Sequence, residues 1–148
     1  MNEFNFENMC ALDIEDIVQI EKLTFGSHSW SEQLFYSELN DPIKHYIVLK
    51  ENNFVIAYGG YAQIHDEGHI MNLAVDQSYR GMGIGKALVL ELISRMKNSS
   101  ITCATLEVNE NNINAIKLYE KLGFELAGKR YNYYAKGESA LIYWLYFE

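Results

Sequence analysis

The most constraining feature of the sequence is a glycine-rich loop between an apolar, strand-like run and a helix-like run. Residues 70–75 (IMNLAV) lead into the loop, residues 76–86 (DQSYRGMGIGK) form it, and residues 87–96 (ALVLELISRM) lead out of it. Glycine lets the backbone approach a ligand closely and take dihedral angles that other residues avoid. The first N–H groups of a helix are unpaired and carry partial positive charge, which suits phosphate oxygens. The stretch therefore predicts a strand–loop–helix unit that cradles a pyrophosphate.

Two common phosphate motifs do not fit this loop. A P-loop requires Ser or Thr after its lysine, but Ala87 follows Lys86. The dinucleotide fingerprint G-x-G-x-x-G fails because its last position is Lys86. What remains is R-G-x-G-x-G, with Arg80 and Lys86 adding positive charge on either side. For the glycines alone, a plain turn before a helix remains an equal alternative.

Size and composition indicate one soluble domain. The chain has 148 residues, of which 49% are hydrophobic, enough to build a core. It has no run of about 18 apolar residues and no basic, then apolar N-terminal leader, so neither a membrane span nor a signal peptide is predicted. Cys10 and Cys103 lie far apart and are expected to be reduced core thiols of a cytoplasmic protein. A monomer is expected rather than an oligomer.

The net charge of −8 argues against direct binding to nucleic acid, which requires a basic face. It does not exclude an anionic cofactor, because the positive charge needed for one is local to the loop. The overall field favours a cationic substrate.

Hydrophobic periodicity and turn residues predict an α/β domain. Asp13 and Ser29 are the expected N-caps of the first two helices. The expected strands are a short one around Phe4 and Phe6, then 45–50, 54–64, 70–75, 101–108, 124–126 and 139–147, and the expected helices are 13–25, 29–39, 84–97 and 112–122. Three of the strands should form an antiparallel meander before the glycine loop.

A second motif runs from residue 106 to residue 124 (LEVNENNINAIKLYEKLGF) and contains N-x-x-A-x-x-L-Y-x-x-x-G-F. Together with the loop, it resembles the GNAT acetyltransferases, whose Q/R-x-x-G-x-G/A loop holds the pyrophosphate of acyl-CoA. The order of expected elements is also that of the family, so the resemblance covers nearly the whole chain. It implies a single GNAT domain over residues 1–148, with a mixed, mostly antiparallel sheet of about seven strands and about four helices on both faces.

Within the family, the chain resembles the RimI branch, which acetylates the N-terminal alanine of a small-subunit ribosomal protein. The resemblance lies in L-E-V at 106–108, S-W-S at 29–31 and R-x-N-Y-Y at 130–134. The chain departs from the branch at Ser29, where the branch has proline, at Asn109, where it usually has arginine, and at Glu138-Ser139, where it has an E-D pair. The last two departures lie near the expected acceptor site.

The resemblance implies acetyl-CoA as co-substrate, no metal, and a set of site residues. Glu107 is the implied general base, directly or through a water, and Tyr119 the implied general acid. Trp30 and Tyr134 are implied at the acceptor site. The implied acetyl-CoA contacts are Leu73, Ala74, Val75, Arg80, Gly81, Met82, Gly83, Ile84, Gly85, Lys86, Asn112 and Tyr119. Simpler readings stay open: a solvated strand glutamate, a core tyrosine, and an Asn112 that only caps a helix.

Three functions remain open, and a protein N-terminal acetyltransferase is the leading hypothesis. An α-amine has a pKa of about 8 against about 10.4 for lysine, so more of it is neutral and nucleophilic at neutral pH. The alternatives are an acetyltransferase for small amines or lysine side chains and a non-catalytic acyl-CoA-binding module. His65-x-x-x-His69 has a spacing that metal sites use, but the intervening turn at Gly68 argues against a shared helical face.

Overall fold

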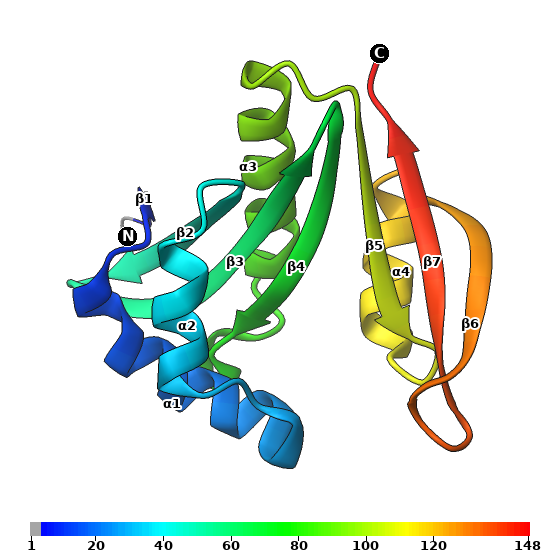
Figure 1. The fold of residues 1–148 in the computed structure, drawn as a ribbon. Helices are drawn as coiled ribbons and strands as arrows, with labels where there is room; N and C mark the ends of the chain where they lie inside the picture. Colours follow the sequence, from blue (N-terminus) through cyan, green and yellow to red (C-terminus); the bar gives the residue numbers. More distant parts are fainter. Residues whose placement is uncertain (1–3) are drawn as a thin grey trace.

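The computed structural model describes residues 4–148, and its centre is a seven-stranded sheet (Figure 1). The strands are β1 (Asn5–Asn8), β2 (Lys44–Glu51), β3 (Phe54–Ile64), β4 (Glu67–Val75), β5 (Cys103–Asn109), β6 (Glu125–Ala135) and β7 (Glu138–Tyr146). The α-helices are α1 (Ile14–Phe25), α2 (Glu32–Leu39), α3 (Ile84–Asn98) and α4 (Ile113–Lys121), and short 3₁₀ turns occupy Ala11–Asp13, Gly26–His28 and Gln77–Tyr79. Within residues 4–148 no helix is both long and apolar enough to cross a membrane.

The strand order is β1-β2-β3-β4-β5-β7-β6, and every neighbouring pair is antiparallel except β4 with β5. The predicted meander is formed by β2, β3 and β4. Asn52 and Asn53 make its first turn with positive φ angles of 52° and 70°, which asparagine tolerates better than most residues. Helix α3 supplies the crossover that a parallel pair requires. The predicted mixed, mostly antiparallel sheet is therefore confirmed.

Helices cover the two faces of the sheet unequally. On the rear face in Figure 1, α3 and α4 bury one apolar core, to which Leu88, Leu92 and Met96 contribute one stripe of α3. On the front face, α1 and α2 pack over β2–β4 and bury a second core that includes Ile17 and Phe35. Figure 1 shows no helix of the described chain in front of β5, β7 and β6. That part of the front face is therefore open.

One of the two predicted helix caps, Ser29, is wrong, and the other, Asp13, has the predicted position but not the capping bond. Ser31, not Ser29, caps α2, with its hydroxyl accepting from the Leu34 N–H at 3.1 Å. Asp13 is the N-cap residue of α1, but its side chain makes no capping bond, because its carboxylate accepts from the Cys10 N–H and pairs with Lys50 at 2.9 Å. Cys103 is buried as predicted, whereas Cys10 is exposed, so the prediction of a core thiol is wrong for Cys10. The pKa of Asp13 is lowered although burial, the largest single influence, acts to raise it, because the bonds from Cys10 and Lys50 together outweigh burial.

Strand β6 is much longer than the predicted strand at 124–126. It carries bulges against β7 between Leu126 and Gly128 and between Arg130 and Ala135, and nearly all of its residues are exposed. An edge strand with neither face fully buried lacks the alternation of apolar and polar residues that reveals strands in sequence. The R-x-N-Y-Y motif lies in this strand.

Candidate active site

The parallel strands β4 and β5 separate along their length and open a cleft. They pair only from Glu67 with Cys103 to His69 with Thr105, and beyond His69 the two strands diverge (Figure 1). The cleft between them has a volume of about 620 Å³. It is lined by Glu21, Thr24, Phe25, His28, Trp30, Met71, Asn72, Leu73, Glu107, Val108, Asn109, Asn112, Ala115, Leu118, Tyr119, Tyr134 and Glu138.

One wall of the cleft is the free edge of β4. Leu73 lines the cleft and packs against the core beneath α3, whereas Ala74 is buried in the core beneath α1 and α2. The Val75 carbonyl accepts from Nε of Arg80 at 3.3 Å. Since β5 makes no ladder with this part of β4, the edge can hydrogen-bond to a ligand.

The glycine loop ends in the left-handed conformation and leads directly into α3. Gly81 and Gly83 both have φ of 79°, and a Cβ built on either would meet no atom within 4 Å. Ala87 donates the first hydrogen bond of the helix to the Gly83 carbonyl at 3.1 Å, so the N–H groups of residues 84–86 precede the helical ladder. The loop therefore combines unobstructed backbone with a helix N-terminus, an arrangement that suits phosphate oxygens.

The two flanking cations differ in their surroundings. The Arg80 guanidinium is held between two elements, because it donates to the Val75 carbonyl and, at 3.2 Å, to the Thr24 hydroxyl of α1. Lys86 is exposed in the first turn of α3. Met82 is also exposed and Ile84 is buried in the core.

Glu107 projects from β5 on the open side of the sheet. Its side chain is 29% exposed, and Oε1 lies 3.2 Å from Nε of Arg130 on β6. The Arg130 guanidinium also lies 5.7 Å above the ring of Tyr133. The carboxylate thus faces both the cleft and a cation, so it is not the isolated, fully solvated strand glutamate of the simpler reading.

Tyr119 reaches the cleft from α4 while its ring stays buried. It is 8% exposed and packs edge-on against Phe124 at 5.7 Å. Burial, with a smaller contribution from Tyr134, raises its pKa to about 12. Burial and then the charge of Glu107 likewise raise the pKa of Tyr134 to about 12. Both phenols therefore remain protonated at neutral pH.

Asn112 begins α4 and also lines the cleft. Its side-chain oxygen accepts from the Ala115 N–H at 3.2 Å, the bond expected of an N-cap. At the other end of the helix, Gly123 has φ of 100° and ends α4 where the sequence predicts. The capping role of Asn112 is confirmed, and its place in the cleft wall leaves its amide nitrogen available to a ligand.

A buried carboxylate that the sequence did not single out holds one side of the cleft together. Glu21 of α1 is fully buried and accepts from the Trp30 N–H at 2.7 Å, from Nδ2 of Asn72 at 2.5 Å and from the Tyr58 hydroxyl. Trp30 in turn packs on Phe35 with ring centroids 5.4 Å apart. The only sequence signal was a charged residue on the apolar stripe of α1.

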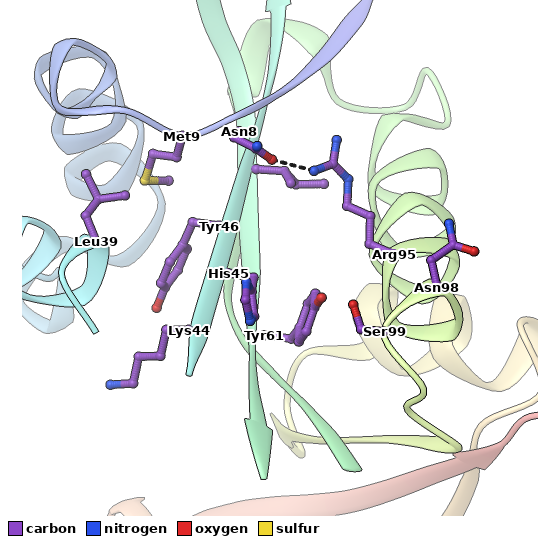
Figure 2. Close-up of a pocket in the computed structure, with 11 residues that line it drawn as sticks. Asn8, Met9, Leu39, Lys44, His45, Tyr46, Tyr61, Arg95, Asn98 and Ser99 are labelled. Carbon is purple, nitrogen blue, oxygen red and sulfur yellow. Dashed lines mark hydrogen bonds between the residues drawn. The ribbon is translucent and has the colours of Figure 1, made fainter. Parts of the chain in front are cut away.

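The structure contains a second cavity, of about 430 Å³, beside the first residues of β2, where β1 does not pair with that strand (Figure 2). Its cations are already paired: Arg95 bonds Asn8 at 2.6 Å and Glu91 at 3.0 Å, and Lys44 pairs with Glu38. Figure 2 shows the Arg95 guanidinium turned toward Asn8. None of the predicted site residues lines this cavity, so it is a poorer place for an anionic ligand than the cleft.

The histidine pair with metal-like spacing does not converge. His65 occupies the turn before β4, and Nε2 of His69 lies 2.9 Å from Glu67 on the open face. Within the described chain, no group of three or more His, Cys, Asp or Glu side chains could hold a metal ion.

Comparison with known proteins agrees with this architecture. The family model for acetyltransferases of the GNAT family matches residues 13–124. A protein of Bacillus subtilis (strain 168) is 35% identical over 140 residues, covering 93% of this chain and 92% of its own length. The ribosomal protein bS18-alanine N-acetyltransferase of Escherichia coli (strain K12) is 36% identical over 126 residues, 84% of each chain.

The similarity extends to a solved structure. The crystal structure of the ribosomal-protein-S18-alanine N-acetyltransferase from Escherichia coli matches with a TM-score of 0.89 and 30% sequence identity, over 99% of this chain and 95% of that one. Sequence, fold and cleft thus agree. The chain belongs to the GNAT family of acetyltransferases, in its RimI-like branch.

Proposed function

We propose that this enzyme transfers the acetyl group of acetyl-CoA to the N-terminal α-amine of a protein, and that the acceptor is the N-terminal alanine of a small-subunit ribosomal protein. The observation that carries the proposal is the convergence of Glu107, Tyr119 and Tyr134 on one cleft beside the free edge of β4. The Escherichia coli relative, 36% identical, is named for that acceptor. A ribosomal acceptor places the reaction in the cytoplasm.

The residues at the start of α3 fit the pyrophosphate of the donor. Gly81 and Gly83 leave open space above the loop, and the N–H groups of residues 84–86 supply donors. Lys86 adds a mobile positive charge, and Asn112 offers an amide on the opposite wall. Along the free edge of β4, the N–H groups of residues 73–75 can donate to the pantetheine arm and to the thioester oxygen. Acetyl-CoA supplies the activated acetyl thioester.

Glu107 acts as the general base in this proposal, directly or through a water. An α-ammonium group has a pKa of about 8, so one carboxylate is enough to remove its proton near neutral pH. Arg130 holds the Glu107 carboxylate at 3.2 Å and so restricts its orientation.

Tyr119 acts as the general acid that protonates the leaving thiolate. Its pKa of about 12 keeps the proton on the phenol throughout the neutral range. Trp30 and Tyr134 form the acceptor wall, and Glu21 fixes Trp30 through its backbone N–H.

Two departures from the branch pattern lie on the acceptor side of the cleft. Asn109 lines the cleft and accepts from the Asn111 N–H at 2.9 Å. Ser139 is buried and its hydroxyl accepts from the Asn132 N–H at 3.1 Å, while Glu138 lines the cleft. Asn109 removes a positive charge and Ser139 removes a negative one, while Glu107 and Glu138 keep the wall acidic, in keeping with a cationic acceptor.

The test compares kcat/KM for three acceptors at one neutral pH. These are a peptide with a free N-terminal alanine, the same peptide with a blocked N-terminus and an internal lysine, and spermidine. We expect the free alanine peptide to be preferred by at least about tenfold, because its amine is neutral more often and its small first residue fits the walled cleft. A tenfold preference for spermidine or lysine would exclude N-terminal acetylation as the main activity and would favour an acetyltransferase for small amines or lysine side chains. Acetyl-CoA binding without turnover of any acceptor would indicate a non-catalytic module.

A further inference from the structure

The open part of the front face carries a strip of apolar and aromatic side chains that begins at the cleft. In the β5–β7 ladder, Ile142 lies opposite Glu107, Trp144 opposite Thr105, and Tyr146 opposite Cys103. Directly opposite residues of an antiparallel pair project on the same face. Ile142, Trp144 and Tyr146 therefore form a row on the face of Glu107, and we name these three residues with His69 the aromatic strip.

The rings of the strip are arranged as a continuous surface. Trp144 and Tyr146 stack with centroids 6.0 Å apart and planes inclined by 14°, and His69 meets Trp144 edge-on at 6.4 Å. Tyr146 is 72% exposed, and Ile142, Trp144 and His69 are half-buried. The described helices on this side lie over β2–β4, so none of them covers the strip (Figure 1). The strip is thus apolar area available to a partner.

The strip is continuous with the cleft along β4 and along β7. On β4, Met71 lines the cleft and His69 belongs to the strip. On β7, Ile142 is the neighbour of Glu107. The strip extends four residues along β7, from Ile142 to Tyr146, which is a length of about 13 Å at about 3.3 Å per residue. An extended polypeptide whose first amine lies at Glu107 can therefore cover the strip with its next few residues.

Charge on this face identifies the kind of segment that fits. Glu67 lies beside His69, Glu125 lies opposite Trp144 in the β6–β7 ladder, and Glu107 stands at the beginning of the strip. Arg130 of β6 also lies near the start of the strip, but its positive charge is already paired with Glu107. Lysine and arginine bind favourably over the face of tryptophan. A second copy of this chain, also with a charge of −8, would be repelled.

Resting on the function proposed above, we propose that the aromatic strip binds the acceptor polypeptide downstream of the residue that is acetylated, as an extended segment carrying basic side chains. The enzyme then recognises its acceptor at two places: the first residue in the cleft, and a basic segment a few residues later on the strip.

The experiment measures kcat/KM for a three-residue and a nine-residue peptide that share their first three residues, with lysines and arginines in the longer one. The enzymes are the wild type, Trp144→Ala, Tyr146→Ser and the control Phe54→Ala, which removes an aromatic ring that is 68% exposed away from this face. In the wild type and the control, kcat/KM for the longer peptide should exceed that for the shorter one by about tenfold, an effect typical of an aromatic anchor in an interface. In Trp144→Ala and Tyr146→Ser that advantage should shrink toward one, while the rate with the short peptide stays unchanged and so shows that each variant is folded.

An advantage of the longer peptide that survives in Trp144→Ala would overturn the proposal. So would the same advantage for a nine-residue peptide in which glutamates replace the basic residues, or a dimer in light scattering that Trp144→Ala converts to a monomer. If the wild type turns over neither peptide, the proposed function fails separately. Calorimetric Kd values of the nine-residue peptide for the wild type and Trp144→Ala then still test whether the strip binds it. Equal Kd values would overturn the proposal.

Discussion

At the scale of single residues, the two side chains proposed to act in catalysis, Glu107 and Tyr119, also have ordinary structural roles. Glu107 is a partly exposed strand glutamate whose orientation is set by Arg130 on a neighbouring part of the sheet. Tyr119 is a core tyrosine by packing, and it also lines the cleft. The two readings of each residue, structural and functional, are therefore compatible.

The residue-scale prediction concerns these two side chains. Glu107→Gln should lower kcat by roughly 10²-fold or more, since general-base catalysis is commonly worth that, and should leave the Kd for acetyl-CoA unchanged. Tyr119→Phe should lower kcat similarly, because it keeps the ring contact with Phe124 at 5.7 Å and removes only the hydroxyl. Tyr131→Phe is the control, as Tyr131 is 76% exposed and outside the cleft. Unchanged kcat in either variant would remove that residue from the mechanism.

At the scale of elements, the junction between β4 and α3 does two things at once. It turns the chain through left-handed glycines at 81 and 83, and it leaves the start of a 15-residue helix open to solvent. Gly85 differs, because a Cβ there would touch Leu118 of α4 at 3.6 Å. The glycines thus serve conformation and access at the first two positions and packing of α3 against α4 at the third.

The element-scale prediction is that Gly83→Val abolishes measurable binding of acetyl-CoA. A β-branched residue at a φ of 79° costs about 1–2 kcal/mol, and its side chain fills the space above the loop. Gly137→Val is a matched control, because Gly137 also has positive φ, 81°, and open surroundings but lies in the β6–β7 turn. The measurements are calorimetric Kd and the rise in Tm on adding acetyl-CoA. Equal affinities for Gly83→Val and wild type would show that the pyrophosphate binds elsewhere.

At the scale of the whole molecule, both cores contain tyrosines that burial keeps protonated. Burial and the nearby Glu21 raise the pKa of Tyr58 far above its usual value, and burial and Glu38 do the same for Tyr46. Tyr119 has a raised pKa in the other core. An unfolded chain ionises its tyrosines near pH 10, so unfolding releases protons above that pH.

The whole-molecule prediction is an alkaline loss of stability. Stability from raised tyrosine pKa values is fully present below about pH 10 and is lost as the pH rises through the folded-state pKa. For Tyr119, a shift from 10.0 to about 12 corresponds to about 3 kcal/mol. Urea unfolding at pH 8 and at pH 11 should therefore show a lower free energy of unfolding at pH 11, and Tyr119→Phe should reduce the difference, whereas Tyr131→Phe should not. An equal difference in Tyr119→Phe would contradict the assignment.

The sequence alone determined the elements whose pattern is local. The glycine loop between a strand and a helix, and α4 with Asn112 at its start and Gly123 at its end, follow from turn chemistry and periodicity within a short window. The order of strands and helices followed from the same signals. Strand β6 did not, because an exposed, bulged edge strand carries no such periodicity.

Only the tertiary structure decided which residues meet. The divergence of β4 from β5 makes the cleft, and the bonds from Asn72 and Trp30 to the buried Glu21 join three segments that are separated along the chain. The pair between Glu107 and Arg130 and the open face that carries Trp144 likewise depend on strand order. Periodicity reports which side of an element is buried, whereas the partner of a polar group depends on how the elements pack, and no local pattern encodes that.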